Sequence, residues 1–353
     1  MIIKETLTPE WIKQASKNNG NADQILVEKA IRALLLVEGL AKTALQFIFK
    51  GGTALMLLQD SAKRLSIDID IVMHERPGNL DQLLQEVVAS QHFNKIELQQ
   101  RTANSGIDKT HYKFFYSPVY REGLGDDYVL LDILFEKHDY SDVHDHKLIS
   151  SFVKSEGSPG VVRIPSFDDL LGDKLTAFAP NTTGVPYERS GNSMSMEIIK
   201  QLYDIGRLFG VAENTQVMKA TFTRMAETQL LYRGGGIKLT DVLEDIYDTA
   251  LCISLKGNHK PENFQRLQQG VKSLGPFIFS EPYRIEGAIR DAAKAAYLSR
   301  IIATDRNGIE RYETPEQVAQ AIIAEPHNTK LNKLKKTDPE AFFYWWKATM
   351  LFQ

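Results

Sequence analysis

The fold is decided by two short stretches, Phe47-Ile-Phe-Lys-Gly-Gly-Thr-Ala-Leu55 and Ser66-Ile-Asp-Ile-Asp-Ile71. In the first, an apolar run ends at the glycine pair Gly51-Gly52 and passes directly into a segment of helix-forming residues. This order predicts a strand, a tight turn and the N-terminus of a helix. Glycine lets the backbone approach a ligand closely, and the N–H groups at a helix start attract anions. The turn is therefore suited to a phosphate.

Apolar and acidic residues alternate in the second stretch. Its isoleucines share one face of a predicted strand, and Asp68 and Asp70 share the other. Neighbouring carboxylates repel each other unless a cation lies between them or water covers them. Either stretch alone is compatible with an ordinary turn or a solvated strand face. Together they predict a phosphate cradle beside hard oxygen ligands, which Mg²⁺ with a nucleoside triphosphate would satisfy.

A third acid, Asp132, interrupts the strand-like stretch Tyr128-Val-Leu-Leu-Asp-Ile-Leu-Phe135, which is apolar on both faces. An ionised carboxylate inside a buried strand is costly unless it is paired or bound to a metal. Two interpretations follow. Asp132 pairs with a nearby basic side chain, or it joins Asp68 and Asp70 as a third metal ligand.

The segments Lys50–Leu55 and Ser66–Asp70 resemble the signature of nucleotidyltransferase-fold proteins of the AbiEii/AbiGii toxin family, the toxin halves of bacterial toxin–antitoxin and phage-defence pairs. The resemblance covers about residues 25–210. It implies metal-binding acids, one of which also takes the proton of the attacking hydroxyl, and phosphate-binding residues near the glycine pair. The acids are Asp68, Asp70 and Asp132, and the nucleotide-binding residues are Gly51, Gly52, Thr53 and Ser66.

Two later helices extend the resemblance. The family has a Lys-Leu helix followed by a helix with a basic residue and then an Asp, which here resemble Lys174-Leu175 and Lys200 with Asp204. By this resemblance Lys174 neutralises triphosphate charge, and Asp204 orients Lys200 or the attacking group. The family often has an acid after the basic residue, where this chain has Gln201. Helical spacing alone places Lys200, Tyr203, Asp204 and Arg207 on one face, for which a solvated surface is the default.

Composition sets the outer limits. The chain has 353 residues with 43% hydrophobic and 25% charged residues, enough for two domains with a sizeable core. Its net charge of −3 gives no global basic field, so any contact with nucleic acid depends on local patches. Cys252 is the single cysteine, which excludes an internal disulfide. No signal peptide or long apolar run is recognisable, which predicts a cytoplasmic protein without a membrane segment.

The remaining periodicity predicts an α+β protein: a nucleotidyltransferase-like mixed sheet flanked by helices in residues 1–165, and an all-helical domain in 166–353 whose first helices complete the active site by resemblance. Helices are expected at about 8–18, 22–46, 80–89, 167–179, 194–209, 214–228, 239–255, 261–273, 284–303, 314–324 and 338–351. Further strands are expected at 95–101, 112–117 and 160–165, with a polar turn at 104–108 and a glycine turn at 234–236.

Two segments leave alternatives open. The stretch 180–193, rich in Gly, Pro, Asn and Ser, is either a flexible connection or a substrate lid. Near the C-terminus, a run of lysines precedes Phe342-Phe-Tyr-Trp-Trp346. A basic run beside aromatic residues can bind RNA by phosphate contacts and stacking, but such aromatic residues more often pack in a core.

The residues and the resemblance together predict Mg²⁺-dependent transfer of a nucleotide from a nucleoside triphosphate to an acceptor hydroxyl. The resemblance suggests a tRNA end as acceptor and an antitoxin protein encoded nearby as partner. One alternative is a small-molecule nucleotidyltransferase of the antibiotic-modifying kind. Another is a catalytically silent nucleotide-binding regulatory module, whose mark would be failure to bind magnesium at intact acids.

Overall fold

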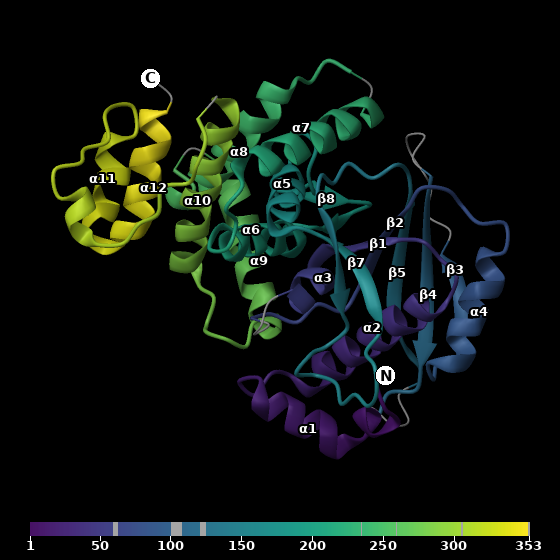
Figure 1. Cartoon of the computed structure of the whole chain (residues 1–353). Coiled ribbons are helices and arrows are strands. Elements are labelled where there is room, and N and C mark those ends of the chain that lie inside the picture. The colour runs from purple at the N-terminus through teal and green to yellow at the C-terminus, as the bar shows by residue number, and fades with distance from the viewer. Residues whose placement is uncertain are drawn as a thin grey trace. The chain divides into compact units, whose positions relative to one another are not determined.

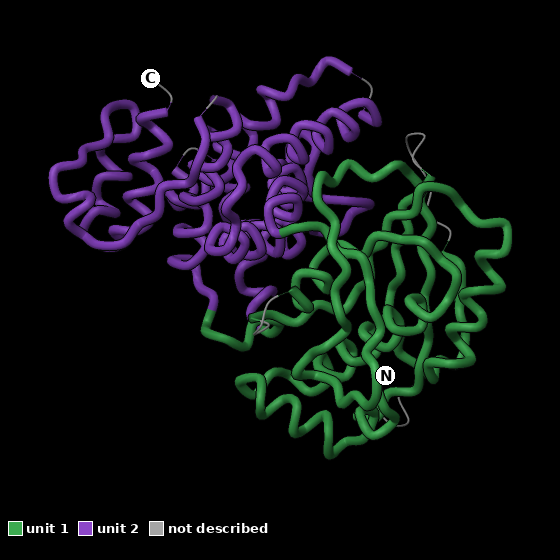
Figure 2. The backbone as a smooth tube through the Cα atoms, viewed as in Figure 1, with its two compact units in different colours: residues 1–166, 276–282 green, residues 167–275, 283–353 purple. Residues whose placement is uncertain are grey.

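The computed structural model describes residues 1–58, 63–99, 108–120, 125–233, 235–258, 260–304 and 306–351. It divides into two compact units, which Figure 2 shows in different colours. Unit 1 contains residues 1–166 and 276–282, and unit 2 contains residues 167–275 and 283–353. The chain therefore leaves unit 1 after Ser166 and returns to it for one short segment.

Unit 1 is built around a mixed sheet of seven strands in the order β3-β4-β5-β2-β1-β7-β6 (Figure 1). The pairs β2/β5 and β1/β7 are parallel, and the other neighbours are antiparallel. The strands are β1 Ile48–Lys50, β2 Ile69–Met73, β3 Lys95–Gln99, β4 Lys109–Tyr116, β5 Asp127–Phe135, β6 Val143–Lys147 and β7 Val161–Pro165. The helices are η1 Lys4–Leu7, α1 Pro9–Asn18, α2 Gln24–Lys42, α3 Gly51–Leu58 and α4 Leu80–Ser90.

Helices α2 and α4 cover one face of this sheet. Asp23 caps α2 by accepting hydrogen bonds from the N–H groups of Ile25 and Leu26, and the buried residues of α2 then pack on the strands. On the same face, Tyr112 of β4 donates a hydrogen bond to Asp81 of α4, and Arg32 of α2 lies over the Tyr116 ring. Because strand residues alternate between faces, the neighbours of Tyr112 in sequence project from the opposite face.

The sequence located most of these elements but missed one strand. The strand–turn–helix around Gly51 is confirmed, with the helix beginning at Gly51 itself. β2 begins at Ile69, one residue after Asp68, so only part of the expected strand is regular. β6 was not predicted, because its sequence, Val-His-Asp-His-Lys, has no apolar alternation. The predicted turn at 104–108 lies, up to residue 107, outside the described residues.

The segment 276–282 belongs to unit 1 because it pairs with the residues before β2. Leu65 donates its N–H to the carbonyl of Phe277 at 2.7 Å, and Phe279 donates to the carbonyl of Lys63 at 3.3 Å. Between these bonds, Arg64 and Ile278 form an isolated antiparallel bridge. This return is not predicted from the sequence, where helices of the C-terminal region flank the segment on both sides.

Unit 2 is helical apart from a short hairpin. Its elements are α5 Phe167–Ala177, β8 Glu188–Arg189, β9 Asn192–Ser193, α6 Ser195–Phe209, α7 Thr215–Tyr232, α8 Leu239–Ser254, α9 Pro261–Leu274, α10 Ile285–Ala303, η3 Pro315–Val318, α11 Asn328–Thr337 and α12 Pro339–Met350. The expected helix at 314–324 is wrong, because only the short η3 forms there. The lysine-rich α11 was not predicted as a helix. Gly234 of the expected glycine turn lies outside the described residues.

The two open segments of unit 2 have defined structures. In the segment 180–193, Asn181 and Thr182 donate hydrogen bonds to Asp245 of α8, and the later residues form the β8/β9 hairpin, so its first part is anchored. In α12, Phe342, Phe343, Tyr344 and Trp345 are 3% exposed or less, which confirms core packing for these side chains. Among the described residues, none of the helices is long and apolar enough to span a membrane.

Candidate active site

The two acids that the sequence singled out on separate strands lie side by side in unit 1. Strands β2 and β5 run parallel, and their register pairs Asp70 with Asp132. The neighbouring pairs extend this row, because Lys50 of β1 is opposite Asp70 and His111 of β4 is opposite Asp132. Paired residues of adjacent strands project from the same face of a sheet. We call Lys50, Asp70, Asp132 and His111 the polar row.

The polar row projects from the face opposite α2 and α4. Asp132 alternates with Leu131 and Ile133, which are at most 1% exposed, whereas the Asp132 side chain is 32% exposed. The expectation that both faces of this strand are buried is therefore wrong. Asp132 Oδ1 lies 2.6 Å from Nδ1 of His111, so a basic side chain does contact the acid. This contact engages one oxygen of the carboxylate.

The polar row reaches the glycine pair through Asp70. Gly51 has a φ of +79°, and a Cβ atom added to it would overlap Oδ2 of Asp70. A Cβ on Gly52 would lie 2.6 Å from Nη2 of Arg64 and 2.7 Å from Oγ of Ser66. The absence of side chains at both glycines thus leaves room for a carboxylate, a guanidinium and a hydroxyl at the start of α3.

Thr53 and Asp68 are placed differently from the polar row. The Thr53 side chain is fully buried, and its hydroxyl donates a hydrogen bond of 2.6 Å to the carbonyl of Asp68. This bond fixes the backbone just before β2. Asp68 itself is exposed. Ser66 lies against Gly52, so the structure brings Ser66 and the glycine pair together and places the Thr53 hydroxyl in the protein interior.

The acids of the polar row suit a hard cation. Two carboxylates on adjacent strands repel each other, and a divalent cation between them relieves that repulsion. Among the described residues, no group of three His, Cys, Asp or Glu side chains is arranged to hold a metal ion. Mg²⁺, however, is commonly held by one or two carboxylates together with water and substrate phosphates. The donor set of Asp70 and Asp132 therefore fits Mg²⁺.

Unit 2 holds the residues predicted from the Lys-Leu helix. Lys174 of α5 is 7% exposed, and its ammonium group lies 2.9 Å from Oδ2 of Asp204 and 3.0 Å from Oε1 of Gln201, both on α6. The structure therefore brings Lys174 and Asp204 together, with Gln201 as a second acceptor. Lys200, one helical turn before Asp204, lies 3.6 Å from Glu197.

On the face of α6 that contains these residues, Tyr203 and Asp204 are buried and Lys200 and Arg207 are partly exposed, so the expectation of a fully solvated face is wrong. Tyr203 and Asp204 are 2% and 1% exposed. The Tyr203 ring packs edge-on against Tyr283, whose hydroxyl donates to Asp291 at 2.9 Å. Asp291 also lies 3.8 Å from Arg207. Burial raises the pKa of Asp291 to about 6, although nearby cationic side chains oppose the shift.

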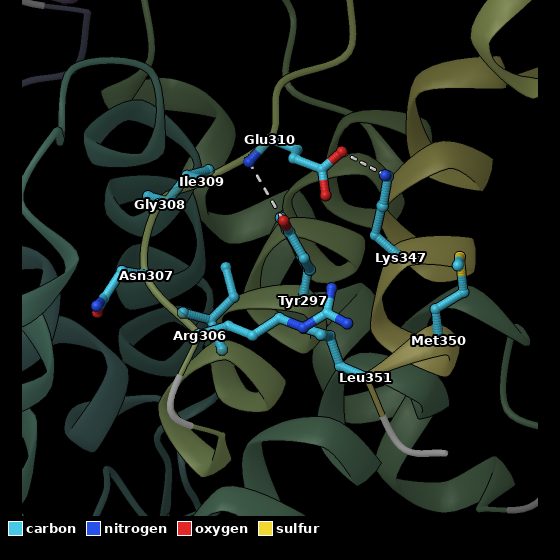
Figure 3. Close-up of a pocket in the computed structure, with 10 residues that line it drawn as sticks. Tyr297, Arg306, Asn307, Gly308, Ile309, Glu310, Lys347, Met350 and Leu351 are labelled. Carbon is cyan, nitrogen blue, oxygen red and sulfur yellow. Dashed lines mark hydrogen bonds and ion pairs between the residues drawn. The ribbon is translucent and has the colours of Figure 1, made fainter.

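A cavity of about 230 Å³ lies elsewhere in unit 2, lined by the end of α10, the segment 306–310 and the end of α12 (Figure 3). Tyr297 lies across it and accepts a hydrogen bond from the N–H of Glu310, whose carboxylate is paired with Lys347. The lining contains none of the predicted site residues. The cavity therefore offers no grouping of acids like that of the polar row.

The sequence reasoning missed His111 and Arg64. The predicted strand began at Tyr112, but the alternation of Tyr112, Phe114 and Tyr116, extended back by one residue, puts His111 on the less apolar face, so a signal was present. The register that aligns His111 with Asp132 was not readable. Arg64, which is 8% exposed, lies against Gly52 in a segment whose backbone is fixed by the bridge to Ile278. That long-range contact is not encoded in any local pattern.

Comparison with known protein families identifies the family of this chain. The family model described as the nucleotidyl transferase AbiEii toxin of the type IV toxin–antitoxin system matches residues 34–276, which is more than half of the chain. The chain belongs to the AbiEii nucleotidyltransferase toxin family. The resemblance read from the motifs around Gly51 and Asp70 is therefore confirmed, and the protein is a nucleotidyltransferase. No curated protein matches the chain.

Two solved structures are similar to the chain. MenT4, a nucleotidyltransferase toxin from Mycobacterium tuberculosis, is 13% identical in sequence to this chain. The match covers 96% of this chain and 99% of MenT4, with a TM-score of 0.54. JHP933 from Helicobacter pylori is 15% identical, with coverage of 82% and 92% and a TM-score of 0.42. The likeness to MenT4 confirms the predicted mixed sheet with flanking helices and C-terminal helices.

Proposed function

We propose that this AbiEii-family protein is an Mg²⁺-dependent toxin that transfers a nucleotide from a nucleoside triphosphate to an RNA hydroxyl, with a tRNA end as the preferred acceptor. The observation that supports the metal requirement is the pairing of Asp70 with Asp132 on adjacent parallel strands. An antitoxin protein encoded nearby is the proposed partner, and the family assignment supports that choice.

The residues of unit 1 have separate roles in this proposal. Asp70 and Asp132 would hold the cation, with Asp68 as a further ligand from the segment just before β2. Mg²⁺ bound there would draw charge from the α-phosphoryl group and from the leaving pyrophosphate. Gly51, Gly52 and Ser66 would lie against phosphate oxygens, where helix N–H groups favour anions. Thr53 would contribute its backbone N–H, since its hydroxyl bonds to Asp68.

The transfer step forms one bond to phosphorus and breaks another. The acceptor oxygen forms a bond to the α-phosphorus, the bond from that phosphorus to the bridging oxygen breaks, and pyrophosphate leaves. The proton of the acceptor hydroxyl passes to Asp132. Lys174 would balance the negative charge of the triphosphate, and Lys200 and Asp204 would assist it. These three roles follow from the family motif and remain predictions.

One local patch favours RNA over a small-molecule acceptor. The segment 326–337 contains four lysines and no acid in a chain whose net charge is −3. Three of these side chains, Lys330, Lys333 and Lys336 of α11, are exposed. Clustered lysines attract a phosphate backbone by releasing its counterions. The buried aromatic residues of α12 take no part, so this attraction would be electrostatic rather than stacking.

A labelled transfer assay tests the proposal. The full chain is incubated with each α-³²P-labelled nucleoside triphosphate, Mg²⁺ and either total RNA or a panel of hydroxyl-bearing antibiotics. We expect label in RNA, and a loss of about 10³-fold in Asp70→Asn and Asp132→Asn, since each removes several kcal/mol of metal-assisted stabilisation. Label on a drug alone would support the small-molecule alternative. Failure of the wild-type chain to bind Mn²⁺ would support the silent regulatory module.

A further inference from the structure

His111 is a member of the polar row that lies outside the family motifs. It lies on β4, directly opposite Asp132 in the register of the sheet. Its Nδ1 atom is 2.6 Å from Oδ1 of Asp132, and its side chain is 16% exposed. The contact joins residues separated by 21 positions, so it is fixed by strand pairing rather than by local sequence.

The geometry of this contact determines which carboxylate oxygen stays available. A carboxylate accepts hydrogen bonds, so Nδ1 of His111 is the donor and Oδ1 of Asp132 is the acceptor. A bond to Oδ1 restricts rotation of the carboxyl group and leaves Oδ2 for another ligand. Carboxylates that bind metals are usually held by such outer hydrogen bonds, and loss of one weakens metal binding or activity by about 10- to 100-fold.

We propose that His111 is a positioning residue that holds Asp132 so that its second oxygen meets the cation shared with Asp70. This inference rests on the proposed function, because it concerns the same acids. His111 does not touch the nucleotide in this proposal. It acts through Asp132, and what it contributes is a single N–H donor at the position of Nδ1.

A second histidine–aspartate pair shows why this contact is unusual within unit 1. On β6, at the edge of the sheet, Nε2 of His144 lies 2.9 Å from Oδ2 of Asp142. These side chains are 64% and 53% exposed, which is the setting of a weak surface pair. Asp132, in contrast, has Asp70 beside it on the central strand β2. His144 is therefore a matched control for His111.

The test measures binding of Mn²⁺ alone to the full chain by electron paramagnetic resonance, without nucleotide, and then kcat and KM for transfer. We expect His111→Ala to raise the Kd for Mn²⁺ by about 10- to 100-fold and to lower kcat more than it raises KM for the nucleotide. In His111→Asn the amide N–H stands close to the position of Nδ1, so this variant should bind Mn²⁺ within about threefold of wild type. His144→Ala should match wild type.

A further substitution separates positioning from packing. In His111→Gln the amide reaches the position of Nε2 rather than Nδ1, so we expect this variant to behave like His111→Ala. If asparagine and glutamine support Mn²⁺ binding equally, or if His111→Ala binds as wild type does, the positioning role is wrong. Asp132→Asn tests the proposed function separately from the role of His111. Unchanged Mn²⁺ binding in that variant would contradict the proposed metal site itself. Thermal unfolding of each variant confirms that the chain is folded.

Discussion

The polar row of unit 1 contrasts with the buried charged residues of unit 2, Lys174, Asp204 and Asp291, which we call the buried cluster. In the polar row, two acids lie next to each other on a partly exposed face, and the side chain of Asp132 is 32% exposed. In unit 2, Lys174 and Asp204 are almost fully buried and lie against each other. Two neighbouring carboxylates repel each other and favour a bound cation, whereas a buried pair of opposite charges neutralises itself. The first arrangement is suited to binding, whereas in the second each charge already has its partner inside unit 2.

The largest effect on stability is expected when the buried pair of Lys174 and Asp204 is broken. Lys174→Ala leaves Asp204 with less compensation in the interior, so we expect unit 2 to lose about 3 to 5 kcal/mol of stability, measured by urea unfolding. The double variant Lys174→Met with Asp204→Leu removes both charges and should recover most of that loss.

The same double variant also measures catalysis. If it is stable but inactive in the transfer assay, the family motif correctly assigns Lys174 to the reaction. The buried pair would then act in catalysis as well as in the fold. If it is stable and active, the pair is structural only. Unfolding of Lys174→Ala at the wild-type urea concentration would show that the pair contributes nothing measurable.

Asp291 of α10, which is also buried in unit 2, leads to a prediction about the pH dependence of stability. Its pKa in the folded protein is about 6, above the ordinary value of 3.8, because burial disfavours the charged form. A raised carboxyl pKa means that the folded state binds the proton more tightly, so stability from this group falls as pH rises from about 4 to about 6. A shift of two pKa units corresponds to about 3 kcal/mol.

Asp291→Asn removes this titration and can keep the contact with Tyr283. We expect the stability of wild type relative to Asp291→Asn to fall by about 2 kcal/mol between pH 4 and pH 6, which is most of the total change, measured by urea unfolding at each pH. A difference that stays constant across this range would show that the arginine and lysine near Asp291 compensate its burial completely. The buried cluster would then be as well neutralised at Asp291 as at Asp204.

The smallest expected effect on stability is that of a substitution at Gly51, next to the polar row. Gly51→Ala places a side chain at a φ of +79°, which costs about 1 to 3 kcal/mol, and its Cβ would push against the Asp70 carboxylate. We therefore expect modest destabilisation with a loss of nucleotidyl transfer well beyond it. Gly52→Ala is the comparison variant, because its Cβ would lie nearest the Arg64 guanidinium and the Ser66 hydroxyl rather than an acid, and we expect it to lose less activity. Equal activity in both variants would contradict the placement of Asp70 beside the turn.

The sequence predicted the parts of this site that local pattern encodes. The glycine pair with its helix and the acids of β2 and β5 follow from short-range order of apolar, glycine and acidic residues. The contact between His111 and Asp132 depends on which strands pair and in which register, and one sequence does not encode that locally. The lysines of α11 concealed a helix, because their charge obscured the apolar spacing of Leu331 and Leu334.

The return of residues 276–282 to unit 1 has a consequence for any attempt to divide the chain. A fragment that stops at Ser166 would lack Phe277, which accepts the N–H of Leu65, and Ile278, which bridges Arg64. The backbone that precedes Asp68 and Asp70 would then lose its neighbour. A fragment limited to residues 1–166 would keep the acids in its sequence but lose part of what fixes their backbone, so any shortened form of unit 1 has to retain residues 276–282.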